Sequence, residues 1–185
     1  MIPHFAKNDL QMFYKYLDNC TNYLEFGSGG STYQASIRKN IKKIISFESD
    51  KDWFLKLKNE IKHNNFIYNF IDLKCKPNNW GHPSKECSIS EYKNYTKLNQ
   101  ELLNNIDLIL IDGRFRVCCA LKCHSLINNE CKIAFDDFLD RKHYHIVLDY
   151  FDIIDKTKDN RMVILKKKNK LVPEELIKKY EIIPA

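Results

Sequence analysis

The most constraining feature of the sequence is an apolar run, Leu108 to Ile111, that lies between Asp107 and Asp112. Four consecutive apolar residues are typical of a strand that is buried on both faces, as strands of parallel sheets are. Other short apolar runs, separated by helical periodicity, predict further strands. The parallel strands are expected at residues 23–26, 43–48, 66–73, 107–112 and 131–135. Strands that alternate with helices predict an α/β domain, with a mostly parallel sheet covered by helices on both faces.

The end of the sequence predicts a closing antiparallel hairpin, residues 150–155 and 161–167, which brings the sheet to seven strands. Ser49 and Asp52 have the spacing of a capping box at the start of a helix. Helices are expected at residues 8–20, 31–40, 53–61, 89–103, around 117–121 and from 141. The prolines and glycine of residues 74–88 predict a loop. We therefore expect one domain, 1–185, with an N-terminal helix (1–20), a core (21–168) and a tail (169–185).

The composition is that of a globular protein, with 44% hydrophobic and 29% charged residues. No apolar run approaches the roughly 18 residues of a membrane span, and the first residues do not resemble a signal peptide. We therefore expect a cytoplasmic protein without a membrane partner. Seven irregularly spaced cysteines predict reduced thiols. Cys119, Cys123 and His124 lack the second half-site that a zinc site requires.

The net charge of +6 is weak evidence for an anionic partner. Of the 30 basic residues 25 are lysine, and lysine, asparagine and isoleucine together supply 64 of 185 positions. A bias of this kind indicates drift of the coding sequence. A basic surface can attract nucleic acid, but no basic and aromatic residues alternate as in an RNA-binding surface. We therefore do not expect a nucleic acid partner.

Three of the five glycines lie close together, in the segment Glu25-Phe26-Gly27-Ser28-Gly29-Gly30-Ser31-Thr32. This segment joins the first expected strand of the sheet to a helix, where glycines allow a ligand to approach the backbone. Glu48 ends the next strand, 21 residues after Gly27, and a carboxylate there can accept hydrogen bonds from both hydroxyls of a ribose. Together these features favour a cofactor of the adenosine type over a tight turn and a solvated acid.

The segment resembles the first motif of class I S-adenosylmethionine-dependent methyltransferases, since an acid precedes the glycines and Thr32 replaces the third glycine of a dinucleotide site. The resemblance covers residues 21–168 and implies the Rossmann-like fold of that class. It implies that Glu48 holds the ribose, and that Asp72 or Trp80 contacts the adenine, although Trp80 can instead close the core. The residues implied around the methionine and ribose are Glu25, Gly27, Ser28, Gly29, Gly30, Ser31 and Thr32, with Asp112 beyond them.

Three acids follow the last two parallel strands: Asp112 after one, and Asp136 with Asp137 after the other. Clustered carboxylates resist ionisation unless a cation is present, and Mg²⁺ prefers oxygen ligands. This pattern is similar to that of metal-dependent O-methyltransferases of the catechol type and the macrocin-type sugar enzymes. The similarity implies a metal at Asp112, Asp136 and Asp137 that activates an acceptor hydroxyl. The alternative is structural: the acids cap a helix, pair with Arg141 or orient the cofactor.

The catechol-type enzymes carry a catalytic lysine after the fourth strand, and this chain has Arg114 and Arg116 there instead. Arginine stays protonated, so these two residues are candidates for binding a carboxylate or phosphate of the acceptor, or for pairing with the clustered acids. The catalytic candidates are then Asp112, Asp137, His143 and His145. We expect methyl transfer to a hydroxyl of a small acceptor, such as a sugar or nucleotide-sugar. The alternatives are methylation of RNA or another polyanion, and a non-catalytic cofactor-binding module.

Overall fold

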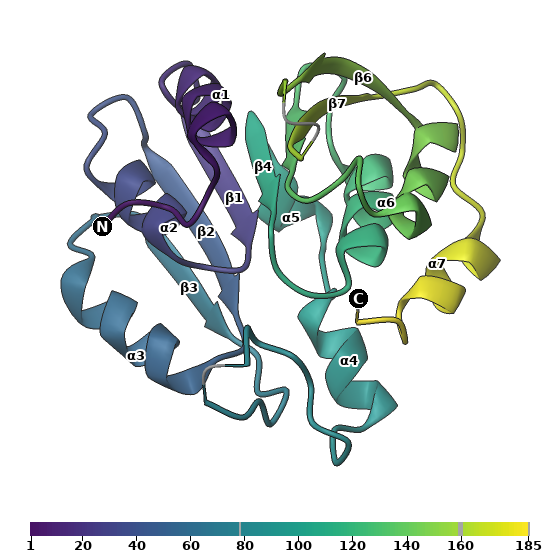
Figure 1. The fold of residues 1–185 in the computed structure, drawn as a ribbon, viewed down its shortest axis with the longest axis horizontal. Helices are drawn as coiled ribbons and strands as arrows, with labels where there is room; N and C mark the ends of the chain where they lie inside the picture. The colour runs from purple at the N-terminus through teal and green to yellow at the C-terminus, as the bar shows by residue number, and fades with distance from the viewer. Residues whose placement is uncertain (78, 159–160, 185) are drawn as a thin grey trace.

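The computed structural model describes residues 1–77, 79–158 and 161–184 of the chain. Over these residues seven strands form one sheet in the order β3-β2-β1-β4-β5-β7-β6 (Figure 1). The first five strands run parallel and β6 and β7 form an antiparallel pair, as the sequence predicts. β7 is also antiparallel to β5. The strands are β1 (Asn22–Phe26), β2 (Lys43–Glu48), β3 (Phe66–Phe70), β4 (Leu108–Ile111), β5 (Lys132–Phe135), β6 (Phe151–Lys156) and β7 (Val163–Lys167).

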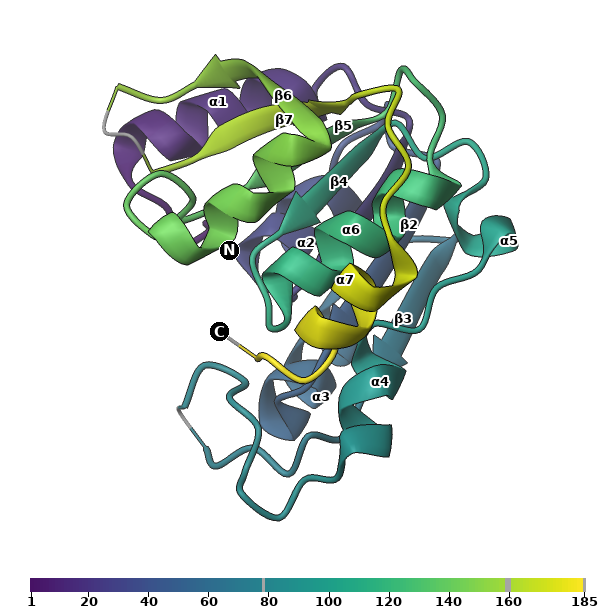
Figure 2. The same ribbon diagram turned by 90° about the vertical axis from the view of Figure 1, so that its right-hand side faces the viewer.

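Helices cover both faces of the sheet (Figures 1 and 2). One face carries α1 (Lys7–Leu17), α2 (Gly30–Ser36) and α3 (Lys51–Glu60). The other face carries α4 (Ile89–Tyr95), α5 (Gln100–Leu103), α6 (Arg116–Leu126), the 3-10 helix η1 (Lys142–Asp149) and α7 (Glu174–Tyr180). The Rossmann-like α/β fold predicted from the sequence is therefore present.

The apolar run of β4 is buried on both sides, which confirms the reason for predicting a covered sheet. Leu108 and Leu110 pack beneath α1 and α2, and Ile109 and Ile111 pack against α6. All four are 2% exposed or less. Full burial of each such side chain contributes about 1.5–3 kcal/mol to the free energy of folding, so this central strand anchors both layers.

Several helix boundaries differ from the prediction. The helix expected over residues 89–103 is divided into α4 and α5, because the Asn99 side chain accepts a hydrogen bond from the Leu102 N–H and starts a new helix. The cap of α3 is Asp50, whose carboxylate accepts from the Trp53 N–H, and not Ser49. The tail contains α7, which packs on α6 and was not predicted.

The order of the strands fixes where a ligand can bind. The chain leaves β1 toward β2 on one side and returns to β4 on the other, so the carboxyl ends of β1 and β4 flank the topological switch point. Ligands of open α/β sheets bind at this point. No helix among the described residues combines the length and the apolar character needed to cross a membrane.

Candidate active site

Glu25 lies beneath the glycine-containing turn rather than at its surface. The side chain is 0% exposed, and burial raises its pKa to about 7 although four hydroxyl groups hydrogen-bond to it and lower it. The hydroxyls belong to Tyr23, Ser31, Thr32 and Ser46. Thr32 also accepts a hydrogen bond of 2.9 Å from the Gly29 N–H. Glu25 therefore holds the turn and the start of α2 in place, and its carboxylate is not exposed at the surface.

Two glycines of the turn are needed for contacts within the chain. Gly27 has a φ of +89°, and a Cβ there would lie 2.8 Å from the Gly113 backbone. A Cβ at Gly30 would collide with the backbone of Ile2 and Pro3, which cross the start of α2. Gly29 is different, because the nearest atom to a Cβ there would be Trp53 Nε1 at 3.8 Å. The open side of this turn is therefore at Gly29.

Glu48 lies at the end of β2, and its two carboxylate oxygens are both hydrogen-bonded. Oε1 accepts from the backbone N–H groups of Ser49 and Asp50, at 2.6 and 2.8 Å. Oε2 accepts from the N–H of Ser28 at 3.0 Å and from its hydroxyl at 2.5 Å. The Ser28 hydroxyl also lies 2.7 Å from that of Tyr68. Burial raises the pKa of Glu48, and these donors lower it.

These residues fit a nucleoside cofactor in the chemistry of their donors and acceptors. Glu48 presents a buried carboxylate to hydroxyl and N–H donors, which is the partner that a ribose diol requires. The Ser28 carbonyl accepts from Trp53 Nε1 at 2.8 Å, which fixes the turn beside Gly29. Both candidates for the adenine lie at the surface. Asp72 accepts from the Lys74 N–H, and the Trp80 ring is 74% exposed, 5.7 Å from the His4 ring.

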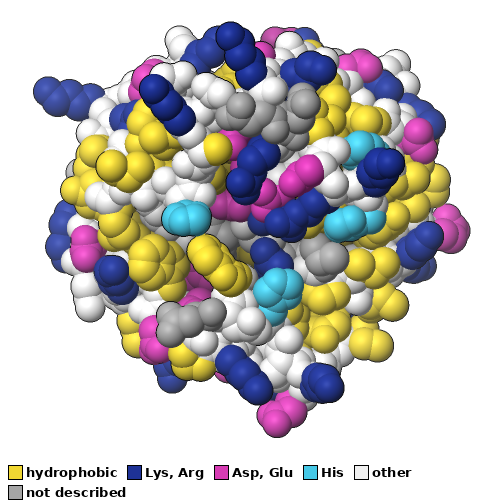
Figure 3. Space-filling view, in the orientation of Figure 1, with side chains coloured by type: hydrophobic (Ala, Val, Ile, Leu, Met, Phe, Trp, Pro, Cys, Tyr) yellow, Lys and Arg dark blue, Asp and Glu magenta, His cyan; other side chains and the backbone are white. Residues whose placement is uncertain are grey.

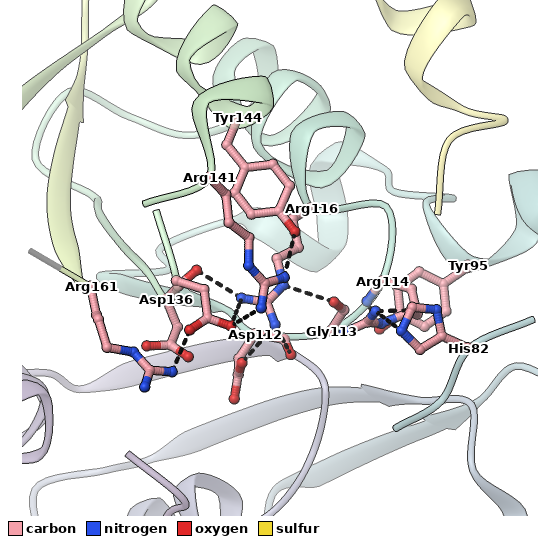
Figure 4. Close-up of polar contacts among 11 residues, drawn as sticks. His82, Tyr95, Asp112, Gly113, Arg114, Arg116, Asp136, Arg141, Tyr144 and Arg161 are labelled. Atoms are coloured by element: carbon pink, nitrogen blue, oxygen red, sulfur yellow. Dashed lines mark hydrogen bonds and ion pairs between the residues drawn. The ribbon is translucent and has the colours of Figure 1, made fainter. Parts of the chain in front are cut away.

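The three predicted acids do meet at the ends of β4 and β5, but arginines surround them (Figure 4). Asp137 accepts from Arg141 at 2.6 Å and from Arg161, and the Arg116 guanidinium lies 3.7 Å away. Asp112 Oδ1 accepts from Arg116 at 3.0 Å. Acidic and basic side chains accordingly gather near the centre of this face of the molecule (Figure 3).

The same arrangement separates the pKa values of the acids. Burial would raise the pKa of Asp137, but Arg116, Arg161 and Arg141 bring it below its ordinary value. Asp136 is 5% exposed and its Oδ1 has no hydrogen-bond partner among the described residues. Burial, together with the charges of Asp112 and Asp137, raises its pKa to about 8. Burial also raises the pKa of Asp112, and Arg116 opposes that shift.

The residues do not fit the magnesium site that the sequence resemblance implied. Guanidinium groups pair with Asp112 Oδ1 and with both carboxylate oxygens of Asp137, which are among the oxygens that a metal would need. In the described parts of the chain, no three His, Cys, Asp or Glu side chains are arranged to hold a metal ion. The structural alternative in which an acid pairs with Arg141 is the one present.

The two arginines after β4 lie in different surroundings. Arg116 is 3% exposed and donates to the carbonyl oxygens of Gly113, Asp136 and Asp112, so it ties together the turns after β4 and β5. Arg114 turns away from the acids, and its Nη1 donates to His82 Nε2 at 2.7 Å (Figure 4). Its backbone N–H donates to the Tyr95 hydroxyl.

The two predicted histidines lie beside the acid cluster and make other contacts. The ring of His145 stacks on Phe138, and its Nε2 lies 3.3 Å from the Phe138 carbonyl. His143 is exposed, with its ring against Tyr144. Neither makes a contact with Asp112, Asp136 or Asp137 among the described residues.

Several residues of the site were not found from the sequence. His82 and Tyr95 come from the segment between β3 and β4, and Arg161 precedes β7. Their partners are 19 residues away or more, so no local pattern indicates the contacts. Arg141 was considered only as a structural partner, and its spacing of four residues from Asp137 was the available signal.

Comparison with known proteins supports the fold and leaves the reaction open. No protein-family model matches the sequence, and no curated protein matches it significantly. Among solved structures, a methyltransferase-like protein from Silicibacter pomeroyi is 23% identical, with a TM-score of 0.85 over 98% of this chain and 97% of that one.

Two other structures are more distant. The B. subtilis m1A22 tRNA methyltransferase TrmK is 12% identical, with a TM-score of 0.54 over 89% of this chain and 67% of its own. The N-terminal domain of EvdMO1, solved in the presence of SAH and D-fucose, is 10% identical, with a TM-score of 0.51 over 88% and 84%. These similarities establish that the chain has the Rossmann-like α/β fold of these proteins.

Proposed function

We propose that this chain is an S-adenosylmethionine-dependent methyltransferase that acts on a hydroxyl group of a small acceptor, a sugar or nucleotide-sugar. The observation that carries the proposal is the hydrogen bonding of Glu48 to Ser28 beside the switch point of the sheet. The fold shared with a methyltransferase-like protein supports the same class of enzyme.

The hydrogen bonds of the Ser28 hydroxyl support a position for the cofactor ribose beside Glu48. The hydroxyl donates to Glu48 Oε2, as a sugar hydroxyl would, and it lies next to the open side of the turn at Gly29. The backbone donors of Ser49 and Asp50 keep Oε1 in place. The hydroxyls of a bound ribose would therefore replace the Ser28 hydroxyl as donors to Glu48 Oε2, and the charge of the site would not change. Trp53 would continue to donate to the Ser28 carbonyl.

When bound, the cofactor supplies a methyl group that is electrophilic because its sulfur is positively charged. We assign Asp112 as the group that takes the proton from the acceptor hydroxyl. Its side chain is 31% exposed, against 10% for Asp137, and Arg116 fixes its Oδ1. Its raised pKa makes it a stronger base than an ordinary aspartate.

Methylation of RNA is less well supported by the surface charge. A groove of about 400 Å³ is lined by Arg38, Lys39, Lys42 and Lys62, among others. These residues precede β2 and β3, so the groove lies at the amino ends of the strands, opposite Asp112. A polyanion bound there would not present its groups to the site.

The proposal is tested by calorimetry with S-adenosylhomocysteine. We expect one molecule bound per chain, and no binding to Gly29→Asp, because a carboxylate would fill the open side of the turn beside Glu48. Ser90→Asp, on the exposed surface of α4, is the matched control and should bind like the wild type. Failure of the wild type to bind contradicts the proposal. Transfer of labelled methyl groups to sugars, nucleotide-sugars and tRNA then separates the acceptor classes and the non-catalytic alternative.

A further inference from the structure

Arg114 differs from the other arginines at this edge of the sheet because it has no acidic partner. Arg116 pairs with Asp112 and Asp137, and Arg141 and Arg161 both pair with Asp137. Across residues 1–77, 79–158 and 161–184, no carboxylate lies within ion-pair distance of Arg114. Arg114 therefore has no direct ion-pair partner within the described structure, and Asp112 acts on its charge only from a longer distance.

Arg114 is also buried with part of its hydrogen-bonding capacity unused. The residue is 7% exposed, and its Nε has no hydrogen-bond partner in the parts of the chain that are described. Nη1 donates to His82 Nε2, which therefore acts as the acceptor. The His82 ring is neutral in this contact and does not balance the charge of Arg114. The unpaired Nε donor and the buried guanidinium without an ion-pair partner both lower the stability of the folded chain. A ligand that supplies an anionic acceptor would restore this stability.

The charge that acts most strongly on Arg114 is positive. Burial and the charge of Arg116 lower the pKa of Arg114 and outweigh the opposing charge of Asp112, and the charges of Arg114, Arg116 and Arg141 add to burial in lowering the pKa of His82. The N-terminus of α6, the positive end of its dipole, begins two residues after Arg114. These contributions favour an anion.

The contact between Arg114 and His82 joins the turn after β4 to the loop that follows β3. Arg114 follows Gly113, whose backbone lies against the Gly27 turn. His82 follows Gly81, whose carbonyl accepts a hydrogen bond from the Ser49 hydroxyl, next to Glu48. A group that binds Arg114 would thus lie between the proposed ribose position and the acids that follow β4 and β5.

We propose that Arg114, with His82 beside it, binds an oxyanion of a ligand, a carboxylate or a phosphate. The guanidinium offers Nε and an Nη in the fork that matches two oxygens of such a group. This inference rests on the proposed function, which offers two sources for the oxyanion. One is the amino-acid carboxylate of the cofactor, and the other is an anionic group of the acceptor, such as the phosphate of a nucleotide-sugar.

Three probes distinguish these sources in binding measurements on the wild type and Arg114→Gln. S-adenosylhomocysteine carries the carboxylate, 5′-methylthioadenosine lacks the whole amino-acid part, and inorganic phosphate is an anion alone. If the carboxylate binds Arg114, the variant loses about 30-fold or more in affinity for S-adenosylhomocysteine and nothing for 5′-methylthioadenosine. If the acceptor anion binds there, both nucleosides bind as before and the variant loses the binding of phosphate.

Lys85→Gln, an exposed cation of the same loop, is the matched control and should bind all three probes like the wild type. Arg114→Lys keeps the charge without the fork and serves if Arg114→Gln does not fold. Equal binding of all probes by wild type and both variants overturns the proposal, as does a wild type that binds none of them. If the wild type binds neither nucleoside, the proposed function fails, whereas binding of phosphate that depends on Arg114 still supports the anion site.

Discussion

The two halves of the carboxyl edge of the sheet bury acids in different ways. At the ends of β1 and β2, Glu25 and Glu48 accept hydrogen bonds from neutral hydroxyl and backbone N–H groups. At the ends of β4 and β5, Asp112 and Asp137 pair with guanidinium groups. In the first half, the donors to the acids are neutral groups that a ligand can replace. In the second half, the partners of the acids are charged arginines.

This difference indicates what each half is suited to bind. A neutral donor such as the Ser28 hydroxyl can be replaced by a ligand hydroxyl with little electrostatic cost. The other half holds four guanidinium groups and three carboxyl groups, and the pKa of Asp136 is raised to about 8. The positive excess favours an anion there. The predictions below test this comparison, from the largest expected effect to the smallest.

Asp137→Asn should lower the free energy of unfolding by about 4 kcal/mol, because it leaves three guanidinium groups without their shared carboxylate. Asparagine tolerates the positive φ of 54° at this position, so the change tests the charge rather than the backbone. Urea denaturation measures the effect. Asp152→Asn removes an exposed pair with Lys168 and should cost less than about 1 kcal/mol. Similar costs for the two variants would contradict the contrast between the halves.

Asp136→Asn should change how stability depends on pH. Since the pKa of Asp136 is raised to about 8 in the folded state, the folded protein keeps a proton that the unfolded chain loses between about pH 4 and 8. The free energy of unfolding of the wild type therefore falls as the pH rises through this window. The variant should remove about 3 kcal/mol of that fall, less than the full shift because Asp112 and Asp137 titrate with it.

The measurement for Asp136 is the difference between variant and wild-type unfolding curves at a series of pH values. Glu25, whose pKa is raised to about 7, adds a fall of the same sign to both proteins and cancels in the difference. Asp140→Asn, at an exposed neighbouring position, is the control. A difference that does not vary with pH would show that Asp136 is ionised throughout.

Glu48→Gln should weaken binding of S-adenosylhomocysteine about 30-fold, or 2 kcal/mol, because an amide cannot accept from two ribose hydroxyls and keep its backbone donors. Calorimetry measures the loss, and circular dichroism checks that the turn is still folded. Glu60→Gln, on the exposed side of α3, is the control. Unchanged affinity would remove Glu48 from the cofactor site.

Ser28→Ala should have the opposite sign and a smaller size. The variant loses the hydroxyl that competes for Glu48 Oε2, so the affinity for S-adenosylhomocysteine should rise about twofold. The same calorimetric titration serves as the measurement. A clear loss of affinity would show instead that Ser28 contacts the cofactor itself.

Chelation should have no effect. Because guanidinium groups neutralise the acids, EDTA should leave both the melting temperature and any methyl transfer unchanged. If EDTA inhibits methyl transfer and added Mg²⁺ reverses the inhibition, the result would support the magnesium site that the sequence resemblance implied.

Much of the fold could be predicted because its signals are local. The apolar run of β4 and the strand–helix alternation define a covered parallel sheet, and the turn after β1 and the acid after β2 indicate a nucleoside site. The convergence of Asp112, Asp136 and Asp137 also follows from strand order alone. What surrounds these acids does not follow from it.

The rest depends on long-range packing. Asp137 meets Arg161 because the hairpin folds back beside β5, and a spacing of 24 residues gives no periodic signal. His82 reaches Arg114 from a loop whose path the sequence does not encode locally. Glycine is needed at position 30 because Ile2 and Pro3, which precede α1, pack against it. Sequence reasoning therefore found the acids and, as one alternative, their pairing with nearby arginines, but it missed Arg161 and the contact of Arg114 with His82.

The close approach of Gly27 and Gly113 has an evolutionary consequence. A side chain at either position would press against the backbone of the other, and at Gly113 against the Tyr95 hydroxyl as well. Because these obstacles are mainly backbone atoms, a substitution at one position cannot make room for a side chain at the other. Among homologues of this chain, sites 27 and 113 should therefore both remain glycine.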